Sequence, residues 1–453
     1  MVRKPGALLT IVTLLVVACA TVKPITVKDP GVRGGPPGAG DPLPGLTPAE
    51  MEFFRAGLEE FVEVEDVKDG LGPRFNLDSC GGCHAQPAVG GSSPSVNPQV
   101  AVASRNGARN TVPSFIKLDG PVREARFQYK ADGTRDGRTR DGGVHNLYTI
   151  AGRTDAPGCV LAQPPFEREV ARRNVIFRIP TPVFGAGLIE GIPDKTIMDN
   201  RDARRSGREA MGIGGRANRR GPGRVNTSGN DGSITRFGWK AQNKSLLVFA
   251  GEAYNVEQGV TNELFPQERD ETPTCLFNAT PEDGTTFDAP TAIEAFGDTM
   301  KFAFFMRFLG PPQPAPETPA SARGRQVFTE IGCDLCHTPV LRTGRSSSAA
   351  LNDKPVPLFS DLLLHRMGPG LADDIFQGVA EGDEFRTAPL WGLGKRIFFL
   401  HDGRTADLVE AIEAHASRGD ARFPPSEANR VIARFRALNK AKMEDLLGFL
   451  RSL

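Results

Sequence analysis

Four stretches of the chain carry apolar residues at helical spacing, and they form two pairs. The first begins at Thr47-Pro48-Ala49-Glu50, a capping box with proline at the first helical position, and predicts a helix over residues 48–64. Thr318-Pro319 starts a second helix, in which Gly324, Val327 and Phe328 share one face. The other two are predicted by apolar residues at i, i+3, i+4 and i+7: Phe302, Phe305, Met306 and Leu309, and Met443, Leu446, Leu447 and Leu450. The pattern predicts two units, each opened and closed by a helix.

The two units differ in length. Residues 92–288 form a long insertion in the first unit, rich in Gly, Asn and Arg, with candidate strands at residues 174–179, 184–189 and 245–249. We expect a mainly α fold, with an N-terminal unit over 47–310 whose loop-rich insertion contains short strands. A proline-rich linker over 311–320 and a C-terminal unit over 321–453 follow.

The first residues read as an export signal. Arg3 and Lys4 precede an apolar run that is too short to span a bilayer. It ends in Val-Val-Ala-Cys, which resembles the bacterial lipoprotein cleavage box, so residues 1–19 are predicted as a signal with Cys19 as the lipidated residue. The alternative is ordinary cleavage at Ala18-Cys19-Ala20. Residues 20–46 are rich in Gly and Pro without an apolar period and predict a tether.

Composition narrows the class of protein. The chain has 453 residues, 39% of them hydrophobic, and a formal net charge of +1, which argues against disorder and against nucleic-acid binding through charge. No later segment is long and apolar enough to span a bilayer, so we expect membrane association only through a lipid at Cys19. The predicted location is the periplasm of a bacterial cell envelope.

A C-x-x-C-H motif follows the opening helix of each unit: Cys80-Gly81-Gly82-Cys83-His84 and Cys333-Asp334-Leu335-Cys336-His337. Two thiols one helical turn apart can each add to a vinyl group of one porphyrin, and the next imidazole can then ligate the iron. C-x-x-C also serves zinc sites and redox dithiols, but zinc needs two further ligands near each pair. The motifs predict two covalent haem c groups in class I cytochrome c-like domains, with His84 and His337 as proximal ligands.

Two cysteines remain after the signal and the haem motifs are assigned. In an oxidising compartment Cys159 and Cys275 are most simply a disulfide. The alternative is a pair of buried thiols.

The C-terminal unit carries three further blocks. Residues 385–390 (Phe-Arg-Thr-Ala-Pro-Leu), 401–404 (His-Asp-Gly-Arg) and 408–412 (Leu-Val-Glu-Ala-Ile) resemble blocks of bacterial di-haem cytochrome c peroxidases and of the methylamine-utilisation di-haem enzyme. The chain from about residue 47 to its end is similar to the di-haem oxidoreductase family, whose members are labelled peroxidases or thiol oxidoreductases. The matching segments are residues 150–153, 184–190, 236–240 and 361–368.

The resemblance implies a sixth ligand for the C-terminal haem. In the peroxidases a methionine stands where His415 stands here, and it ligates the electron-accepting haem. A His/His iron has a lower potential than a His/Met iron, so ligation by His337 and His415 makes this haem the weaker oxidant. Met367 and His365 are alternative ligands, and His415 is alternatively a helix-surface or capping residue.

The N-terminal haem has no obvious sixth ligand. The peroxidases carry a distal histidine soon after the first motif, whereas residues 85–104 contain none and the next candidate is His145, alternatively a loop histidine. An open iron splits peroxide best beside a proton carrier and a cation. Glu190 and Arg236, in matched segments, are the candidates for those roles, and a structural salt bridge is the alternative for each. Trp391 is a candidate electron bridge between the haems, and core packing is its alternative.

These features predict an exported di-haem enzyme that reduces hydrogen peroxide, or a similar small oxidant, with electrons from a small donor protein, a cytochrome or a cupredoxin. The alternative is an electron-transfer cytochrome without turnover. In that version the family's association with imelysin-like proteins suggests iron handling at the cell surface. Calcium between the units is possible on family grounds, although no residue pattern shows it.

Overall fold

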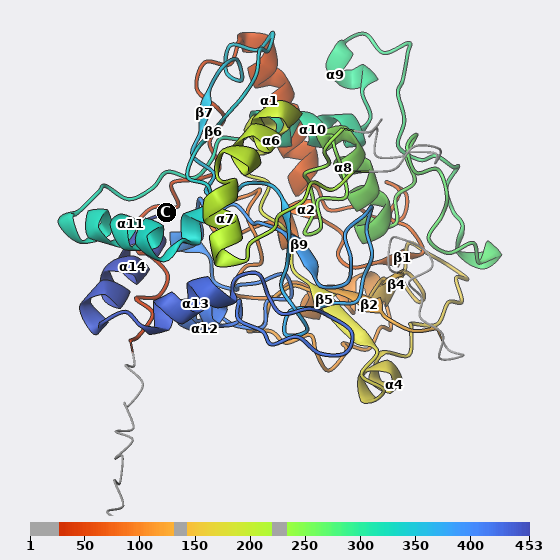
Figure 1. The fold of residues 1–453 in the computed structure, drawn as a ribbon. Coiled ribbons are helices and arrows are strands. Elements are labelled where there is room, and N and C mark those ends of the chain that lie inside the picture. The colour runs from red at the N-terminus through yellow and green to blue at the C-terminus, as the bar shows by residue number, and fades with distance from the viewer. Residues whose placement is uncertain (1–26, 131–142, 220–232) are drawn as a thin grey trace, which may run out of the picture.

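The computed structural model describes residues 27–130, 143–219 and 233–453, and helices and long loops dominate it (Figure 1). The helices are α1 (Pro48–Val62), α2 (Cys80–Cys83), α3 (Gln99–Val102), α4 (Phe166–Ala171), α5 (Ala186–Glu190), α6 (Asp194–Ala203), α7 (Arg205–Met211), α8 (Leu246–Ala253), α9 (Ala292–Ala295), α10 (Asp298–Phe308), α11 (Pro319–Ile331), α12 (Leu408–Glu413), α13 (Asn429–Arg436) and α14 (Lys440–Ser452). The strands are β1 (Arg74–Phe75), β2 (Glu124–Phe127), β3 (Val144–His145), β4 (Tyr148–Thr149), β5 (Val175–Arg178), β6 (Leu341–Arg342), β7 (Pro355–Val356), β8 (Leu364–Arg366) and β9 (Glu384–Arg386).

The four helices predicted from apolar spacing are present, and they pack as two pairs, α1 against α10 and α11 against α14. Capping boxes at Thr47 and Thr318 start α1 and α11, as the sequence predicts. Each pair approaches closely at a glycine. A Cβ on Gly57 would collide with the Lys301 backbone, and one on Gly324 would collide with the Asp445 backbone. Both units therefore use the same local device to bring the opening helix against the closing helix.

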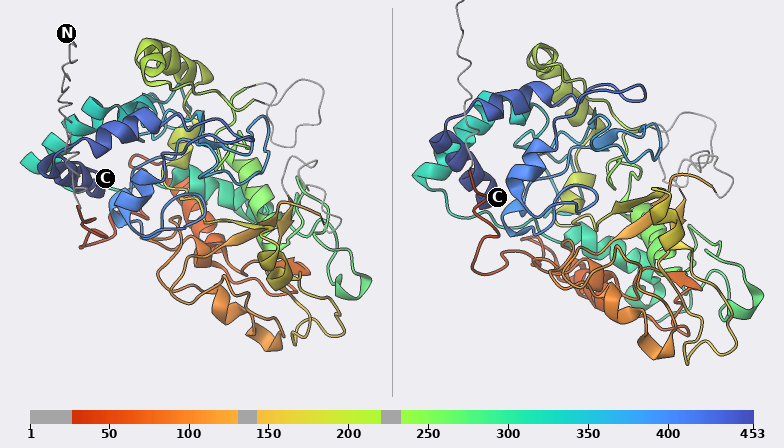
Figure 2. Two further views of the ribbon diagram at one scale, coloured as in Figure 1. Left: turned by 60° about the horizontal axis from the view of Figure 1, so that its bottom comes forward. Right: turned by 90° about the horizontal axis from the view of Figure 1, so that it is seen from below.

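The two pairs are separated in space, with α11 and α14 at the left of Figure 1 and α1, α8 and α10 towards its top and upper right; Figure 2 gives two further views of the same arrangement. One buried apolar cluster nevertheless spans both units. It joins Phe302 and Phe305 of α10 to Leu358, Leu362 and Trp391 of the C-terminal unit. A second cluster surrounds α11 and α14. The two predicted units therefore share one apolar cluster.

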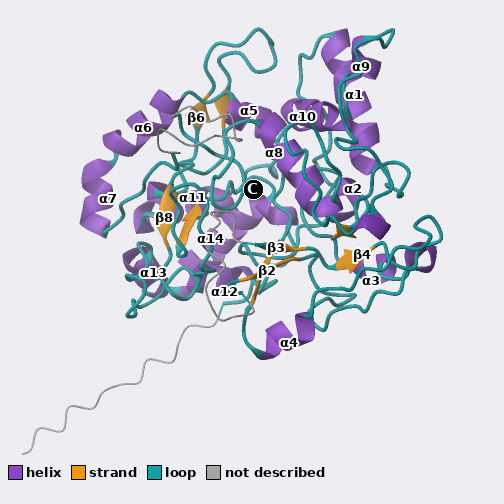
Figure 3. Cartoon of the chain, turned by 90° about the vertical axis from the view of Figure 1, so that its right-hand side faces the viewer, coloured by secondary structure: helices purple, strands orange, loops and turns teal. Residues whose placement is uncertain are grey.

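The insertion contains a three-stranded antiparallel sheet in the order β3-β2-β5, of which β2 and β3 are labelled near the centre of Figure 3. The predicted strand over residues 174–179 is confirmed as β5. The other two predicted strands are wrong, because residues 184–189 run into helix α5 and residues 245–249 run into helix α8. Short apolar runs do not distinguish a buried helix from a buried strand. The Ser245 side chain accepts a hydrogen bond from the Val248 backbone amide and so caps the N-terminus of α8, which favours a helix here.

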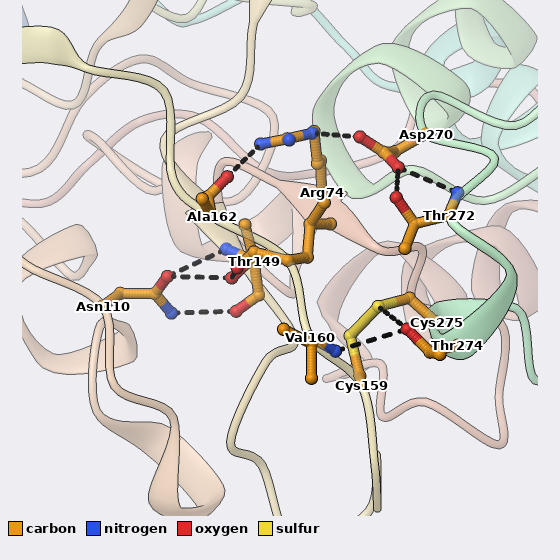
Figure 4. The surroundings of a disulfide bond; sticks show 11 residues. Arg74, Asn110, Thr149, Cys159, Val160, Ala162, Asp270, Thr272, Thr274 and Cys275 are labelled. Atoms are coloured by element: carbon orange, nitrogen blue, oxygen red, sulfur yellow. Dashed lines mark hydrogen bonds and ion pairs between the residues drawn. A yellow bond between two sulfur atoms is a disulfide. The ribbon is translucent and has the colours of Figure 1, made fainter.

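A disulfide joins Cys159 to Cys275 and so links two distant loops of the insertion, 116 residues apart (Figure 4). Ion pairing supports the same region, since Arg74 Nε lies 2.7 Å from Asp270 Oδ2. The Arg74 guanidinium also donates to the Ala162 backbone oxygen at 3.1 Å. These contacts tie β1, beside the first C-x-x-C-H motif, to the disulfide loops.

The predicted tether is packed against the fold over its described part, residues 27–46. Asp29 accepts hydrogen bonds from Arg451 Nε at 2.9 Å and from the Leu408 amide at 2.8 Å. The Leu43 amide donates to the Phe308 oxygen at 2.7 Å. This segment therefore runs as a strap from the C-terminal unit to the closing helix of the N-terminal unit, which Gly/Pro content alone did not indicate. The signal prediction and Cys19 lie outside the described residues.

Within the described ranges no helix has both the length and the apolar character needed to cross a bilayer.

Candidate functional site

The first C-x-x-C-H motif forms the short helix α2 and borders a cavity. Cys80, Cys83 and His84 all line it, and the cavity measures about 430 Å³. His84 Nδ1 lies 3.0 Å from the Gly91 carbonyl oxygen, so it must donate its proton there. That tautomer leaves a lone pair on Nε2, the atom that histidine offers to metals. Burial lowers the pKa of His84 to about 4, so the ring is neutral.

The second motif repeats this arrangement. Cys333, Cys336 and His337 line a second cavity of about 220 Å³. His337 Nδ1 lies 3.0 Å from the Phe359 carbonyl oxygen, so Nε2 again carries the lone pair. Burial, and then the neighbouring His415, lower the pKa of His337 to about 4. The two motifs thus present the same three groups to two separate cavities.

The geometry gives little support to the zinc and dithiol alternatives. In the part of the chain that the structure describes, no group of three or more His, Cys, Asp or Glu side chains lies close enough to hold a metal ion. Burial raises the pKa of Cys333 to about 12 and that of Cys80 and Cys83 well above the usual range. A thiol with a raised pKa stays protonated at neutral pH and is therefore a poor nucleophile, which argues against a redox dithiol at either motif.

His415 lies just after α12 and lines the second cavity together with His337. Its Nδ1 donates to the Ala411 oxygen at 2.8 Å, so His415 has the same tautomer as the two motif histidines. His365 also lines this cavity, but its Nε2 lies 3.0 Å from Asp361 and its Nδ1 lies 2.7 Å from Glu427. Both ring nitrogens of His365 are engaged, so of the two alternatives to His415 named from the sequence only Met367 keeps an unengaged ligand atom in this described cavity.

Two strand residues and one turn residue bring charged groups into the first cavity. Glu124 and Arg126 share one face of β2, and Arg126 Nη2 lies 2.7 Å from Glu124 Oε1. Glu257 enters from the π-helical turn Tyr254–Gln258. Burial, with smaller contributions from Glu124 and Glu252, raises the pKa of Glu257 to about 8. A protonated carboxyl and a guanidinium therefore face one space beside His84.

Candidate sixth ligands at the first cavity are fewer. His145 pairs with Ala125 in the β2–β3 ladder, but its side chain lies outside what the structure describes. The Met306 side chain lines the cavity, a possibility that the sequence analysis treated only as helix packing. The Phe61 ring contacts both the His84 ring, at 5.9 Å, and the Phe302 ring, at 6.0 Å. Phe61, Phe302 and Met306 therefore belong to one apolar part of the cavity wall.

Comparison with known families decides the class of protein. The family model described as "Di-haem oxidoreductase, putative peroxidase" matches residues 166–453. The chain belongs to this di-haem oxidoreductase family. The matched region contains the second motif, His415 and Glu257, and the family implies haem cofactors and redox catalysis.

Similarity between this di-haem oxidoreductase and solved structures is low. The diheme peroxidase BthA from Burkholderia thailandensis E264 is 13% identical, with a TM-score of 0.38 over 94% of this chain and 95% of that chain. A MauG-like protein associated with microbial copper homeostasis is 18% identical, with a TM-score of 0.24 over 34% of this chain and 52% of that chain, about half its length. Kuenenia stuttgartiensis hydrazine synthase is 15% identical, with a TM-score of 0.24 over 46% and 61% of the two chains. No curated protein matches the chain.

The structure of the di-haem oxidoreductase places Glu190 and Arg236 in structural pairs. Glu190 binds Arg307 Nε at 2.9 Å and accepts the Leu246 amide at 2.8 Å. Arg236 pairs with Asp194 and donates to backbone oxygens. Neither is among the described residues that line the cavity beside His84. The geometry instead offers Glu257, Glu124 and Arg126, which no local sequence signal had singled out.

A tryptophan does lie between the cavities, but it is Trp239. Its side chain lines both the first and the second cavity, and its Nε1 donates to the Ile179 oxygen at 2.9 Å. Trp391, the tryptophan predicted for this role, packs in the apolar cluster shared by the predicted units and also borders a small cavity beside Trp239. Trp239 stands inside a family-matched segment, and that was its only signal in the sequence.

Proposed function

We propose that this di-haem oxidoreductase carries two covalent haem c groups in two cytochrome c-like units. Thioether bonds to Cys80 and Cys83 hold the first haem, with His84 as its proximal ligand. Cys333, Cys336 and His337 hold the second. The equal tautomers of the two histidines support the assignment. The first cavity also contains polar atoms that have no partner among the described residues, including Arg123 Nε, Arg178 Nε and Asn76 Nδ2, as expected of a space shaped for a polar cofactor edge.

His415 is the proposed sixth ligand of the C-terminal haem, while the N-terminal haem keeps an accessible position. Within the described residues Nε2 of His415 has no hydrogen-bond partner, and His415 lines the same cavity as His337. At the first cavity the described groups that project from β2 and the turn at residue 257 are carboxyls and a guanidinium. These are groups suited to a small polar oxidant.

We infer that the reaction is reduction of hydrogen peroxide, H2O2 + 2 e⁻ + 2 H⁺ → 2 H2O. Bound haem supplies one-electron redox chemistry at each site, so two haems together hold the two electrons needed. Glu257 holds a proton at its carboxyl because burial keeps it protonated near neutral pH. Arg126 offers positive charge to the leaving oxygen, and Glu124 orients that guanidinium through their ion pair. The convergence of Glu257, Glu124 and Arg126 on the cavity that His84 lines is the observation that carries this proposal.

Trp239 supplies the proposed route for electrons between the haems, since its ring borders both cavities. We propose that the electrons come from a small redox protein, a cytochrome or a cupredoxin, in the periplasm. There, a lipid at Cys19 would hold the enzyme at a membrane. These elements rest on the haem chemistry and on the export signal.

A second candidate, electron transfer without peroxide turnover, is favoured by one observation. Met306 lines the first cavity, and a thioether sulfur is an axial ligand in many cytochromes. Ligation by Met306 would close the N-terminal iron and leave a two-haem electron carrier.

Absorption and EPR spectra of the purified protein separate the two functions. Spectra are recorded in the oxidised and half-reduced states, with and without one equivalent of peroxide. A peroxidase shows one high-spin haem whose spectrum changes on peroxide addition, with two electrons consumed per peroxide. Two low-spin haems that peroxide leaves unchanged in both states would overturn the peroxidase proposal.

A further inference from the structure

Two cationic side chains meet at the junction of the two units. Arg386 is the last residue of β9 and is only 6% exposed. Its backbone amide donates a hydrogen bond to the Trp239 backbone oxygen at 2.9 Å. Arg396 follows the turn Leu393–Lys395. Both guanidinium groups line the second cavity and also a small cavity between the units, which Trp239 and Trp391 border.

Neither arginine has a carboxylate partner within the described ranges. Arg386 donates from Nε to the Gly238 oxygen at 3.1 Å and from Nη1 to the Thr387 oxygen at 3.3 Å, which are neutral acceptors. Other buried arginines of the chain do have carboxylates: Arg178 with Asp373, Arg208 with Asp361, and Arg451 with Asp29. The pair at the junction is therefore unusual within this molecule.

The two charges also act on each other. Burial lowers the pKa of both Arg386 and Arg396 to about 10, and the charge of Arg396 contributes to the shift at Arg386. Both side chains remain cationic at neutral pH. A buried cation beside a half-buried one, with no carboxylate partner among the described residues, is strongly unfavourable, so the folded protein needs an anion at this place.

The cavity itself indicates which anion. Its lining is largely apolar, and it contains the two thiols and the two imidazoles proposed to hold the C-terminal haem. A haem has vinyl groups, which the cysteines take, and two propionate carboxylates, which need cations. Guanidinium forms paired, charge-assisted hydrogen bonds with carboxylates.

We propose that Arg386 and Arg396 clamp the propionates of the C-terminal haem at the junction, beside Trp239. The clamp rests on the proposed haem assignment but not on peroxidase activity. Positive charge next to a haem favours its reduced form, so the clamp raises the potential of this haem and offsets part of the lowering by His/His ligation. It also brings the propionate edge to the tryptophan that borders both cavities.

The test compares three variants of the haem-loaded protein by spectroelectrochemical titration of both haems. Arg396→Gln removes the charge, Arg396→Lys keeps it, and Arg325→Gln is the matched control on the exposed face of α11, where Arg325 is 58% exposed. Arg396 is the better target because Arg386 also supports the Gly238 backbone. We expect R396Q to lower the potential of one haem, R396K to restore most of it, and R325Q to change neither.

A second readout addresses the anion itself. In reduced-minus-oxidised infrared spectra, R396Q should gain a carboxylic-acid signal that does not shift in protein labelled with ¹³C at Asp and Glu, because that acid belongs to the cofactor. An unchanged potential in R396Q, an equal fall at both haems, or a signal that shifts with the label would each overturn the clamp. Lack of haem at Cys333 and Cys336 in the unmodified protein would instead overturn the proposed function.

Discussion

The two cavities present the same motif to different surroundings. Around His84 the wall contains Glu124, Arg126 and Glu257, whereas around His337 it is mainly aliphatic and aromatic, and its polar members include His415 and the two arginines Arg386 and Arg396. The first cavity is also about twice as large, about 430 Å³ against about 220 Å³. In the proposed function the same motif therefore serves two purposes. The polar wall around His84 would suit proton-coupled chemistry, and the more apolar wall around His337, with His415 as the proposed second ligand, would suit a haem that only passes electrons.

The largest effect should come from removing the proton carrier of the polar cavity. Glu257→Gln keeps the size of the side chain but cannot give up a proton. We expect kcat/KM for peroxide to fall by roughly 10²–10⁴-fold, the usual contribution of a general acid or base. Stopped-flow assay with a small chemical reductant measures this. Glu294→Gln on α9, outside the cavity lining, is the control, and equal rates in both variants would remove Glu257 from the mechanism.

The same residue predicts a pH dependence. Because the pKa of Glu257 is raised to about 8, the carboxyl is protonated below that pH and loses its proton above it. Peroxide turnover should therefore stay level from pH 6 to 7 and decline as the pH rises through about 8. In Glu257→Gln this decline should disappear from the pH profile, and its persistence would assign it to another group.

Loss of the disulfide should destabilise the N-terminal unit more than the C-terminal unit. The bond between Cys159 and Cys275 closes a loop of 116 residues in the N-terminal insertion, and a loop of about 100 residues corresponds to roughly 4.7 kcal/mol in the chain-entropy model. We expect Cys159→Ser with Cys275→Ser to lower the free energy of unfolding by about 2–5 kcal/mol. Denaturant titration followed separately at each haem checks this, and a matching loss at the C-terminal haem would show that the units unfold together.

The apolar cavity can be altered at its proposed sixth ligand. His415→Met should raise the potential of the C-terminal haem by on the order of 0.1 V, a fraction of the roughly 0.8 V that axial ligands span. The N-terminal haem should stay near its original potential. Redox titration of both haems provides the measurement. If neither potential moves, Met367 becomes the candidate to test.

The smallest expected effects concern the helix pairs. Gly57→Ala and Gly324→Ala each insert a methyl group against the backbone of the facing helix, which typically costs about 1–3 kcal/mol. Gly57→Ala should destabilise mainly the N-terminal unit and Gly324→Ala mainly the C-terminal unit, whereas the disulfide has no counterpart in the C-terminal unit. Thermal unfolding with haem absorbance as the probe tests this, with Gly448→Ala as the control, because nothing lies within 4 Å of a Cβ at that position.

The sequence by itself determined the features that depend on neighbours in the chain. The capping boxes at Thr47 and Thr318, the four apolar helix faces and the two C-x-x-C-H motifs follow local rules of spacing and capping, and the helices appear as predicted. The family blocks belong to the same category, and the family match confirms what they indicated. His415 could also be named from the sequence, because it follows the His-Asp-Gly-Arg block at residues 401–404 by a short distance along the chain.

Only the tertiary structure decided which side chains share a cavity. Glu124 and Arg126 come from a strand and Glu257 from a turn more than a hundred residues later, so no spacing rule could bring them together. The matched segments that contain Glu190 and Arg236 pointed to a pair that the fold uses for structural contacts with Arg307 and Asp194. Local patterns fix helices because their contacts are three or four residues apart. The charge environment of each cavity depends on long-range packing, which also selected Trp239 over Trp391 and α5 and α8 over strands.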